Sequence, residues 1–220
     1  MAYRFERRRN MIKKYWKILI IVSVVILLPV LAGVILWNQL PEQIPTHWNA
    51  AGEVDGWSSK AFAVFGLPVI LLVAQWLCVL GTGADPKKQN HPKKVVHLVL
   101  WIIPALSVFL MAITYAVALG KTVRMEVVMP VIVGFLLAVI GNYLPKCKQN
   151  YTIGIKIPWT LNSEENWNKT HRFAGRLWLV CGLLIMLTGF FGGVWVFFPV
   201  VLLMVLAPVI YSYLLHRKGI

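Results

Sequence analysis

Residues 18–37 read ILIIVSVVILLPVLAGVILW, twenty residues without a charge. A helix needs about 20 apolar residues to cross the hydrocarbon core of a bilayer. The run follows an Arg- and Lys-rich segment, as in a secretory signal peptide, but it is longer than the roughly 7–15 residues of a signal peptide's apolar region. Since no small-residue cleavage site follows, we expect a retained first membrane span.

Five further apolar tracts follow, at residues 61–80, 95–119, 127–144, 177–194 and 195–215. The last two form one tract that is too long for a single crossing. Glycines interrupt it at Gly189, Gly192 and Gly193, and we expect a tight hairpin at the last two. The prediction is an all-α membrane protein with six transmembrane helices in one domain, residues 18–215, between a basic N-terminal segment (1–17) and a short C-terminal one (216–220).

The composition excludes an ordinary soluble domain, because 59% of the residues are hydrophobic and only 14% are charged, against about 25% charged in globular domains. The net charge of +14 is that of many nucleic-acid-binding proteins, but its distribution indicates a membrane topology. With the N-terminus inside, the inner segments carry 19 Lys and Arg residues and the outer ones three. Positive charges favour the cytoplasmic side, so we expect a multi-pass protein of a bacterial cell membrane with both termini cytoplasmic.

No cofactor, metal or direct nucleic-acid contact is expected. The three cysteines, Cys78, Cys147 and Cys181, have neither metal-site nor disulfide-framework spacing. The loop at residues 81–94 looks like a polar tether. The spans lack the chain of Asp, Glu or His that a proton-coupled pump needs.

The first long loop, residues 38–60, reads NQLPEQIPTHWNAAGEVDGWSSK and lies outside in this topology. Pro41 and Pro45 fix an extended start. Turns are expected at Asn49, Gly52 and Gly56.

Three interpretations of this outer loop stay open. It is an extracellular recognition surface for a cationic or amphipathic ligand, a metal site built on His47 with Glu53 and Asp55, or a folded cap whose side chains bond to local backbone. Trp48 and Trp57 are placed at headgroup level.

The second long loop, residues 146–172, reads KCKQNYTIGIKIPWTLNSEENWNKTHR and lies inside. Gly154 and Pro158 exclude a continuous helix through its first half. Asn162 is expected to cap a helix, with Glu165 completing a capping box, and this helix runs on into the fifth span. Glu165 and Lys169 are spaced for an i,i+4 ion pair.

Glu164, Trp167 and His171 are expected on one face of this helix, at i, i+3 and i+7. That face could contact a soluble partner, line a cavity, pack on other loops or anchor the interface. Glu164 and His171 could also form an acid–base pair. Without a nucleophile or metal motif, we do not expect an enzyme.

Two stretches of the chain share a short sequence pattern. Residues 38–41, NQLP, match residues 142–145, NYLP, and each precedes a long loop with Ile-Pro and then a Trp followed by a hydroxyl residue. Three spans per half would place the halves in opposite orientations, as in the 3+3 inverted-topology repeat of transporters.

The outer loop resembles the pattern L-P-x-x-I-P-x-H-[WF]-x-x-x-G-x-x-D of the SdpI family of bacterial immunity and signal-transduction membrane proteins. The inner loop is similar to that family's second motif, along G-N-x-x-P-K-x-K-x-N, then G-[IL]-[RK]-x-P-W-T-L, then S-E-x-x-W-x-K-T-H-R. One departure is Lys156-Ile157, where the family often has Arg-Thr. Lys keeps the charge but loses the planar fork of Arg.

The resemblance implies a membrane protein that protects its own cell from a secreted toxin peptide. In the family's named system, the protein also acts as a receptor that holds a cytoplasmic transcriptional repressor at the membrane. Besides membrane lipids, the implied partners are therefore a toxin outside and a repressor inside. The alternative function is a transporter or permeation pathway for a peptide or small solute.

Site residues carried over from the family fall into two sets. The outer, ligand-binding set is His47, Trp48, Asn49, Asp55 and Trp57. The inner set, for partner binding or cavity lining, is Asn150, Gly154, Pro158, Trp159, Thr160, Ser163, Glu164, Trp167, Lys169, Thr170, His171 and Arg172.

Overall fold

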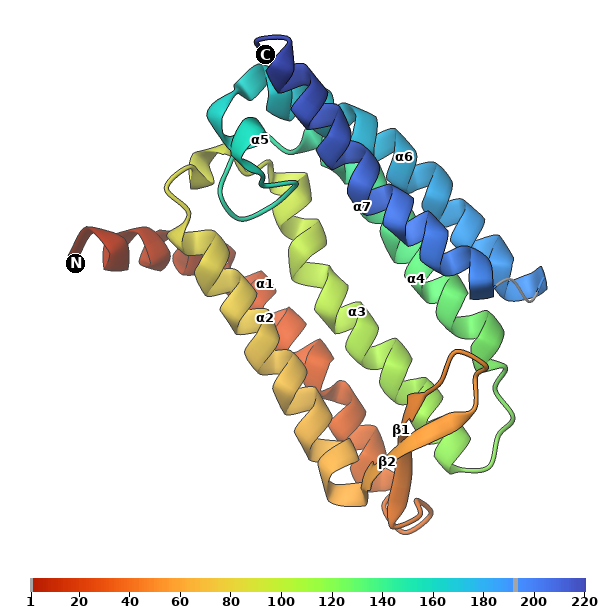
Figure 1. Ribbon diagram of the computed structural model, residues 1–220. Helices are drawn as coiled ribbons and strands as arrows, with labels where there is room; N and C mark the ends of the chain where they lie inside the picture. Colours follow the sequence, from red (N-terminus) through yellow and green to blue (C-terminus); the bar gives the residue numbers. More distant parts are fainter. Residues whose placement is uncertain (1, 192–193) are drawn as a thin grey trace. The chain divides into compact units, whose positions relative to one another are not determined.

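The computed structural model describes residues 2–191 and 194–220, with one small β-hairpin and six long helices (Figure 1). The main elements are α1 (Ala2–Ile35), β1 (Gln43–Trp48), β2 (Val54–Ser59), α2 (Leu67–Ala84), α3 (Lys93–Ala118), α4 (Met125–Tyr143), α5 (Pro158–Asn162), α6 (Glu164–Phe191) and α7 (Val194–Arg217). Short π or 3₁₀ turns are η1 (Phe62–Gly66), η2 (Lys88–Asn90) and η3 (Leu144–Lys146).

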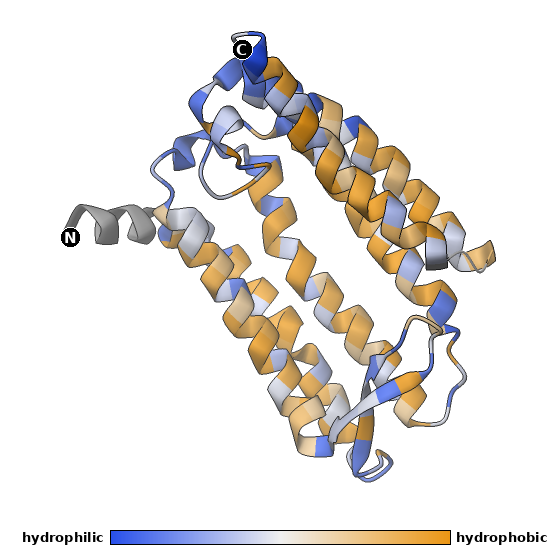
Figure 2. Ribbon diagram, viewed as in Figure 1, coloured by the Kyte–Doolittle hydropathy of each residue, from blue (hydrophilic) through white to orange (hydrophobic). Residues whose placement is uncertain are grey.

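The six long helices are each long and apolar enough to cross a membrane. Apolar residues run along them, while hydrophilic residues gather at their ends and in the connections (Figure 2). Large apolar side chains are exposed on all six, as expected of surfaces that lipid covers. The predicted all-α membrane fold with six spanning helices is confirmed.

The last apolar tract forms two helices. α6 and α7 pack antiparallel, with Cys181 and Ile185 against Val200 and Met204. The hairpin predicted at Gly192-Gly193 lies outside the described residues. Gly189 was expected to break the tract, and that was wrong, because it lies within α6.

The chain divides into two compact units. Unit 1 contains Met1–Ala84 and Val96–Val123, with α1, α2 and most of α3. Unit 2 contains Asp85–Val95 and Arg124–Ile220, with α4 to α7. The inverted repeat and the single-domain boundaries stay predictions.

In unit 1, side chains of α3 bond to carbonyl oxygens of α1. The Ser107 hydroxyl donates to Ile26 O at 2.9 Å, and the Tyr115 hydroxyl donates to Pro29 O at 3.0 Å. A buried side-chain donor that finds a backbone acceptor avoids the cost of burying an unpaired polar group. These bonds hold α3 against α1 near the base of the hairpin, where Tyr115 packs with Ile44 in one buried cluster.

In unit 2, α4 and α6 approach closely along a stripe of small residues. A Cβ on Gly182 would lie 2.5 Å from Ala138 N and 2.6 Å from Gly134 O, so only glycine fits there. Glycines recur at seven-residue steps on both helices, which keeps them on one face. They are Gly134 and Gly141 on α4, and Gly175, Gly182 and Gly189 on α6. Small residues let helix backbones pack closely in membranes, where dispersion contacts replace the hydrophobic drive.

Two local predictions were wrong. Asn162 ends α5, and α6 is capped instead by Ser163, whose Oγ accepts the N–H of Asn166 at 3.2 Å. The supposed tether at residues 81–94 completes α2, forms η2 and starts α3.

Candidate functional site

The predicted outer loop is an antiparallel β-hairpin. Strand β1 pairs with β2, with Ile44 opposite Ser58 and Trp48 opposite Val54. At the tip, Asn49 Oδ1 accepts the N–H groups of Ala51 and Glu53, at 2.9 and 3.0 Å. The folded-cap interpretation describes this tip, although strand pairing was not foreseen.

The sides of the hairpin expose an acidic and aromatic surface. His47 Nδ1 lies 2.5 Å from Asp55 Oδ1, with the side chains 71% and 43% exposed. Trp57 is 58% exposed, and the sites of Trp48 and Asn49 are half-buried. The structure therefore brings the five outer residues together on one small element.

The metal interpretation of this loop finds no support in its geometry. The Glu53 carboxylate accepts from Asn49 Nδ2 at 3.0 Å instead of joining His47 and Asp55. Among the described residues, no group of three or more His, Cys, Asp or Glu could hold a metal ion.

A buried lysine fixes the base of the hairpin. Lys60 Nζ donates to Trp37 O, just after α1, at 3.2 Å and pairs with Glu42 Oε1 at 2.9 Å. Its side chain is only 9% exposed. Sequence reasoning treated Lys60 merely as an outer charge, because burial and the Trp37 carbonyl depend on the fold.

The inner motif is built around Trp167 and His171, both buried and stacked at 4.0 Å between ring centroids. Trp167 Nε1 donates to Cys147 O at 2.7 Å. His171 Nε2 accepts the N–H of Ile155 at 2.9 Å, and Nδ1 lies 2.8 Å from Trp167 O. Only the neutral ring with its proton on Nδ1 satisfies both contacts.

His171 therefore does not form the acid–base pair with Glu164 that their spacing allowed. Both ring nitrogens of His171 are bonded to backbone. Glu164 is exposed while Trp167 and His171 are buried, so the three do not present one common face to a partner.

Gly154 lies against this ring stack with a φ of 118°. L-residues with side chains rarely adopt that backbone conformation. A Cβ there would also collide with His171 and lie 3.1 Å from the Trp167 ring. Glycine is thus required on both counts.

Short side-chain bonds shape the rest of the inner loop. Asn150 Oδ1 accepts the N–H groups of Thr152 and Ile153, at 2.8 and 2.7 Å. Thr160 Oγ1 accepts the N–H of Ile157 at 3.1 Å and donates to Ile155 O at 2.8 Å. These two bonds of Thr160 close the first turn of α5.

The remaining inner residues divide by exposure. Trp159 is half-buried and its ring lies 5.1 Å from that of Tyr213. Thr170 is buried and donates to Asn166 Oδ1 at 3.1 Å. Ser163 is half-buried, and Pro158, Glu164, Lys169 and Arg172 are exposed. The predicted Glu165–Lys169 ion pair is confirmed at 2.7 Å.

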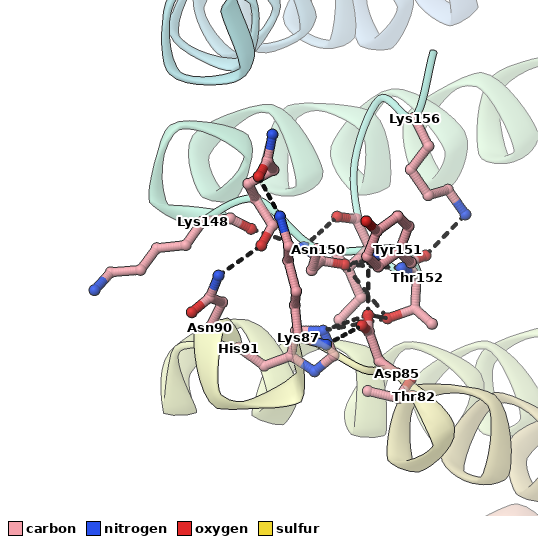
Figure 3. Close-up of polar contacts among 12 residues, drawn as sticks. Thr82, Asp85, Lys87, Asn90, His91, Lys148, Asn150, Tyr151, Thr152 and Lys156 are labelled. Atoms are coloured by element: carbon pink, nitrogen blue, oxygen red, sulfur yellow. Dashed lines mark hydrogen bonds and ion pairs between the residues drawn. The ribbon is translucent and has the colours of Figure 1, made fainter. Parts of the chain in front are cut away.

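Sequence reasoning missed a buried carboxylate, Asp85, which is 2% exposed. Its Oδ2 accepts from Thr152 Oγ1 at 2.7 Å, from Tyr151 N at 2.9 Å and from His91 Nε2 at 3.1 Å (Figure 3). Its Oδ1 accepts from Lys87 N at 2.7 Å. Four donors therefore satisfy this carboxylate.

These donors keep Asp85 ionised. Burial alone raises the pKa of the carboxyl. The bonds from Thr152, Lys87 and Tyr151, together with the charge of His91, outweigh burial and hold the pKa below its ordinary value.

The segment around Asp85 supports the inner loop through a second set of bonds. Lys87 Nζ donates to Gln149 Oε1, and Asn90 Nδ2 donates to Gln149 O at 2.7 Å (Figure 3). Gln149 Nε2 in turn donates to Thr160 O at 2.9 Å, at the start of α5. The only sequence signal was Asp85 just before Pro86, which indicates a turn and says nothing of burial.

Comparison with known proteins now adds to this geometry. The sequence profile of the SdpI/YfhL protein family matches residues 146–212. The chain is 30% identical over 191 residues to "Immunity protein SdpI" of Bacillus subtilis (strain 168), covering 87% of this chain and 90% of that protein. The chain belongs to the SdpI family. The resemblance predicted from the two loops is confirmed.

The SdpI match begins at Lys146 and covers the inner motif, α5, α6 and most of α7. A second profile, a domain of unknown function (DUF1648), matches residues 24–72 and so includes the hairpin. No solved structure matches the chain.

Proposed function

We propose that this chain is an immunity protein of the bacterial cytoplasmic membrane, which protects its own cell from a secreted toxin peptide. The observation that carries the proposal is the 30% identity to a protein named for immunity, extending over nearly the whole of both chains. That coverage includes both the hairpin and the inner motif, so neither candidate region lies outside the similarity.

The hairpin is the proposed toxin-binding element. The distribution of Lys and Arg predicts that it lies outside the cell. The Asp55 carboxylate and the exposed Trp57 indole suit a cationic, amphipathic peptide, since one offers charge and the other a large apolar contact. Lys60 anchors the base, so the exposed residues need little ordering when a ligand binds.

The proposed inner partner is a cytoplasmic transcriptional repressor held at the membrane. The accessible acidic part of the inner motif is the start of α6, where Glu164, Glu165 and Asn168 are exposed. The buried members, Trp167 and His171, hold the preceding loop against this helix.

A co-precipitation experiment tests the inner role. After toxin treatment, the full chain should retain the repressor. The triple variant Glu164→Ala/Glu165→Ala/Asn168→Ala should lose it at unchanged membrane abundance. A variant of exposed residues at the C-terminal end, Arg217→Ala/Lys218→Ala, is the matched control. Equal retention by both variants would contradict the inner assignment.

The transporter alternative makes a different prediction. Purified chain in sealed proteoliposomes would then release a trapped peptide or solute at a rate that depends on the chain. The immunity proposal expects release no faster than from protein-free vesicles.

A further inference from the structure

One face of α6 is exposed from Arg172 onward. The exposed residues follow one another at steps of three or four and lie within about 80° around the helix axis, which keeps them on one side of the helix. They are Arg172, Arg176, Val180, Leu183 and Leu187. This face points away from the glycine stripe that packs on α4 and from the buried residues that pack on α7.

The C-terminal part of this row, from Val180 to Leu187, is a lipid-facing surface. Val180 is 62% exposed and Leu183 is 50% exposed. The sequence carries no charge from Leu177 to Phe191, so hydrocarbon is the solvent that suits this stretch.

Arg172 and Arg176 lie on the same face of α6, on the N-terminal side of the apolar residues. Their depth in the membrane follows from the contact of the neighbouring Gly175 with Pro145. A Cβ on Gly175 would come within 2.5 Å of Pro145 Cγ. Pro145 belongs to η3, where the apolar helix α4 gives way to the polar inner loop. Both arginines therefore lie at the edge of the apolar layer.

Neither guanidinium has a hydrogen-bond or ion-pair partner within residues 11–191 and 195–220, whose side chains the structure describes. Lys169, on the preceding turn, differs because it pairs with Glu165. Arginine carries five donors in a fixed fork that matches phosphate oxygens. An unpaired cation next to hydrocarbon is costly unless its apolar stem extends to a polar partner at the interface.

We infer that Arg172 and Arg176 form a binding site for the phosphate of an anionic phospholipid headgroup. The two forks are one helical turn apart, and a lipid whose phosphate lies between them places its acyl chains along Val180, Leu183 and Leu187. The site has the positive charge, the position at the edge of the apolar layer and the adjoining apolar surface that such a lipid needs. The inference does not depend on the immunity proposal.

This inference reassigns Arg172. The family resemblance placed Arg172 with the inner partner-binding residues, whereas its position on the row places it with the lipid. Asn168 and Glu164, one and two turns nearer the start of α6, remain for a soluble partner.

Lipid titration of the full chain in a neutral detergent tests the site. Bound lipid is counted by native mass spectrometry with phosphatidylglycerol or phosphatidylcholine as the probe. The chain should prefer phosphatidylglycerol. Since a basic side chain at an anionic surface strengthens binding by about fivefold, Arg172→Gln/Arg176→Gln should lower that preference by roughly 25-fold. The control Lys148→Gln/Lys218→Gln removes two exposed charges off the row and should retain it.

Two outcomes would overturn the inference. One is equal binding of the two lipids by the unaltered chain, which requires no variant to fold. The other is a double arginine variant that still prefers phosphatidylglycerol. If that variant lost repressor binding instead, the arginines would belong to the soluble partner. Inorganic phosphate at the lipid's concentration should not displace phosphatidylglycerol, and displacement would assign the arginines to free phosphate.

Discussion

Asp55 and Trp57 are the residues on which the outer part of the proposal depends. A few exposed aromatic and charged residues usually dominate a binding surface, and truncating one commonly costs more than about 1 kcal/mol. Asp55→Ala and Trp57→Ala should therefore each lower protection about tenfold in the toxin dose that cells survive. The control is Gln43→Ala, exposed at the start of β1. Unchanged protection in both test variants would remove the hairpin as the toxin site.

Asp85 should matter through the inner loop that it holds. Asp85→Asn keeps the shape but puts an amide nitrogen in place of one carboxylate oxygen. Either Lys87 N then loses its acceptor on Oδ1, or Tyr151 N, Thr152 Oγ1 and His91 Nε2 lose theirs on Oδ2. Leaving a buried donor unsatisfied costs about 1–3 kcal/mol. Hydrogen exchange should therefore rise at the backbone N–H of Tyr151 or of Lys87. Glu164→Gln, at an exposed carboxylate, should leave it unchanged. Equal exchange in Asp85→Asn and the unaltered chain would contradict the role.

The pH dependence of this support follows from the lowered pKa of Asp85. A carboxyl with a lower pKa in the folded state stabilises above its unfolded pKa, and the stabilisation is lost as the pH falls through the folded pKa. Exchange at Tyr151, corrected for intrinsic rates, should therefore contain no contribution from Asp85 titration between about pH 5 and 8. Loosening should begin only in acid below the ordinary pKa of aspartate, and an Asp85-dependent step near neutrality would contradict the assignment.

Single residues were the hardest features to predict. The two motifs gave the residues of the hairpin and of the inner loop, but not which of them are buried. Ser163 and Asn162 are adjacent and both suit a helix cap, so chemistry alone could not choose between them. Asp85 was missed because two of its four donors, Tyr151 and Thr152, lie 66 and 67 residues away in sequence.

At the level of the helices, the α4–α6 contact predicts a sharp contrast between two glycines. Gly182→Ala would press a Cβ against the backbone of Ala138 and Gly134, and overpacking of this kind typically costs about 1–3 kcal/mol. Gly81→Ala in α2 meets nothing within 4 Å and should be neutral or stabilising by up to about 1 kcal/mol. Thermal unfolding in detergent compares the two. A Gly182→Ala chain as stable as Gly81→Ala would contradict the close contact.

Helices were predicted well because apolar length alone determines whether a segment can span. Their contacts were not, since the glycine spacing on α4 and α6 gains meaning only once the two helices are known to be neighbours. The hairpin was expected as turns with an extended start. Its strand register rests on Ile44, which is buried in the core of unit 1, and that core was not foreseeable from the loop.

The whole molecule combines a membrane fold that the sequence predicts with a family membership that the comparisons establish. The direction of the chain rests on the charge distribution, and the toxin and repressor roles rest on similarity to an immunity protein. The spanning helices divide three and three between units 1 and 2. The inverted repeat stays a prediction, because it also requires that the two halves superpose.

A killing assay tests the central claim most directly. The full chain is expressed in a toxin-sensitive bacterial strain, its membrane abundance is measured, and the cells are exposed to the secreted peptide toxins of the bacterium that encodes it. Cells with the chain should survive a toxin concentration that kills cells with an empty vector. Equal death of both, with the chain present in the membrane, would contradict the immunity function.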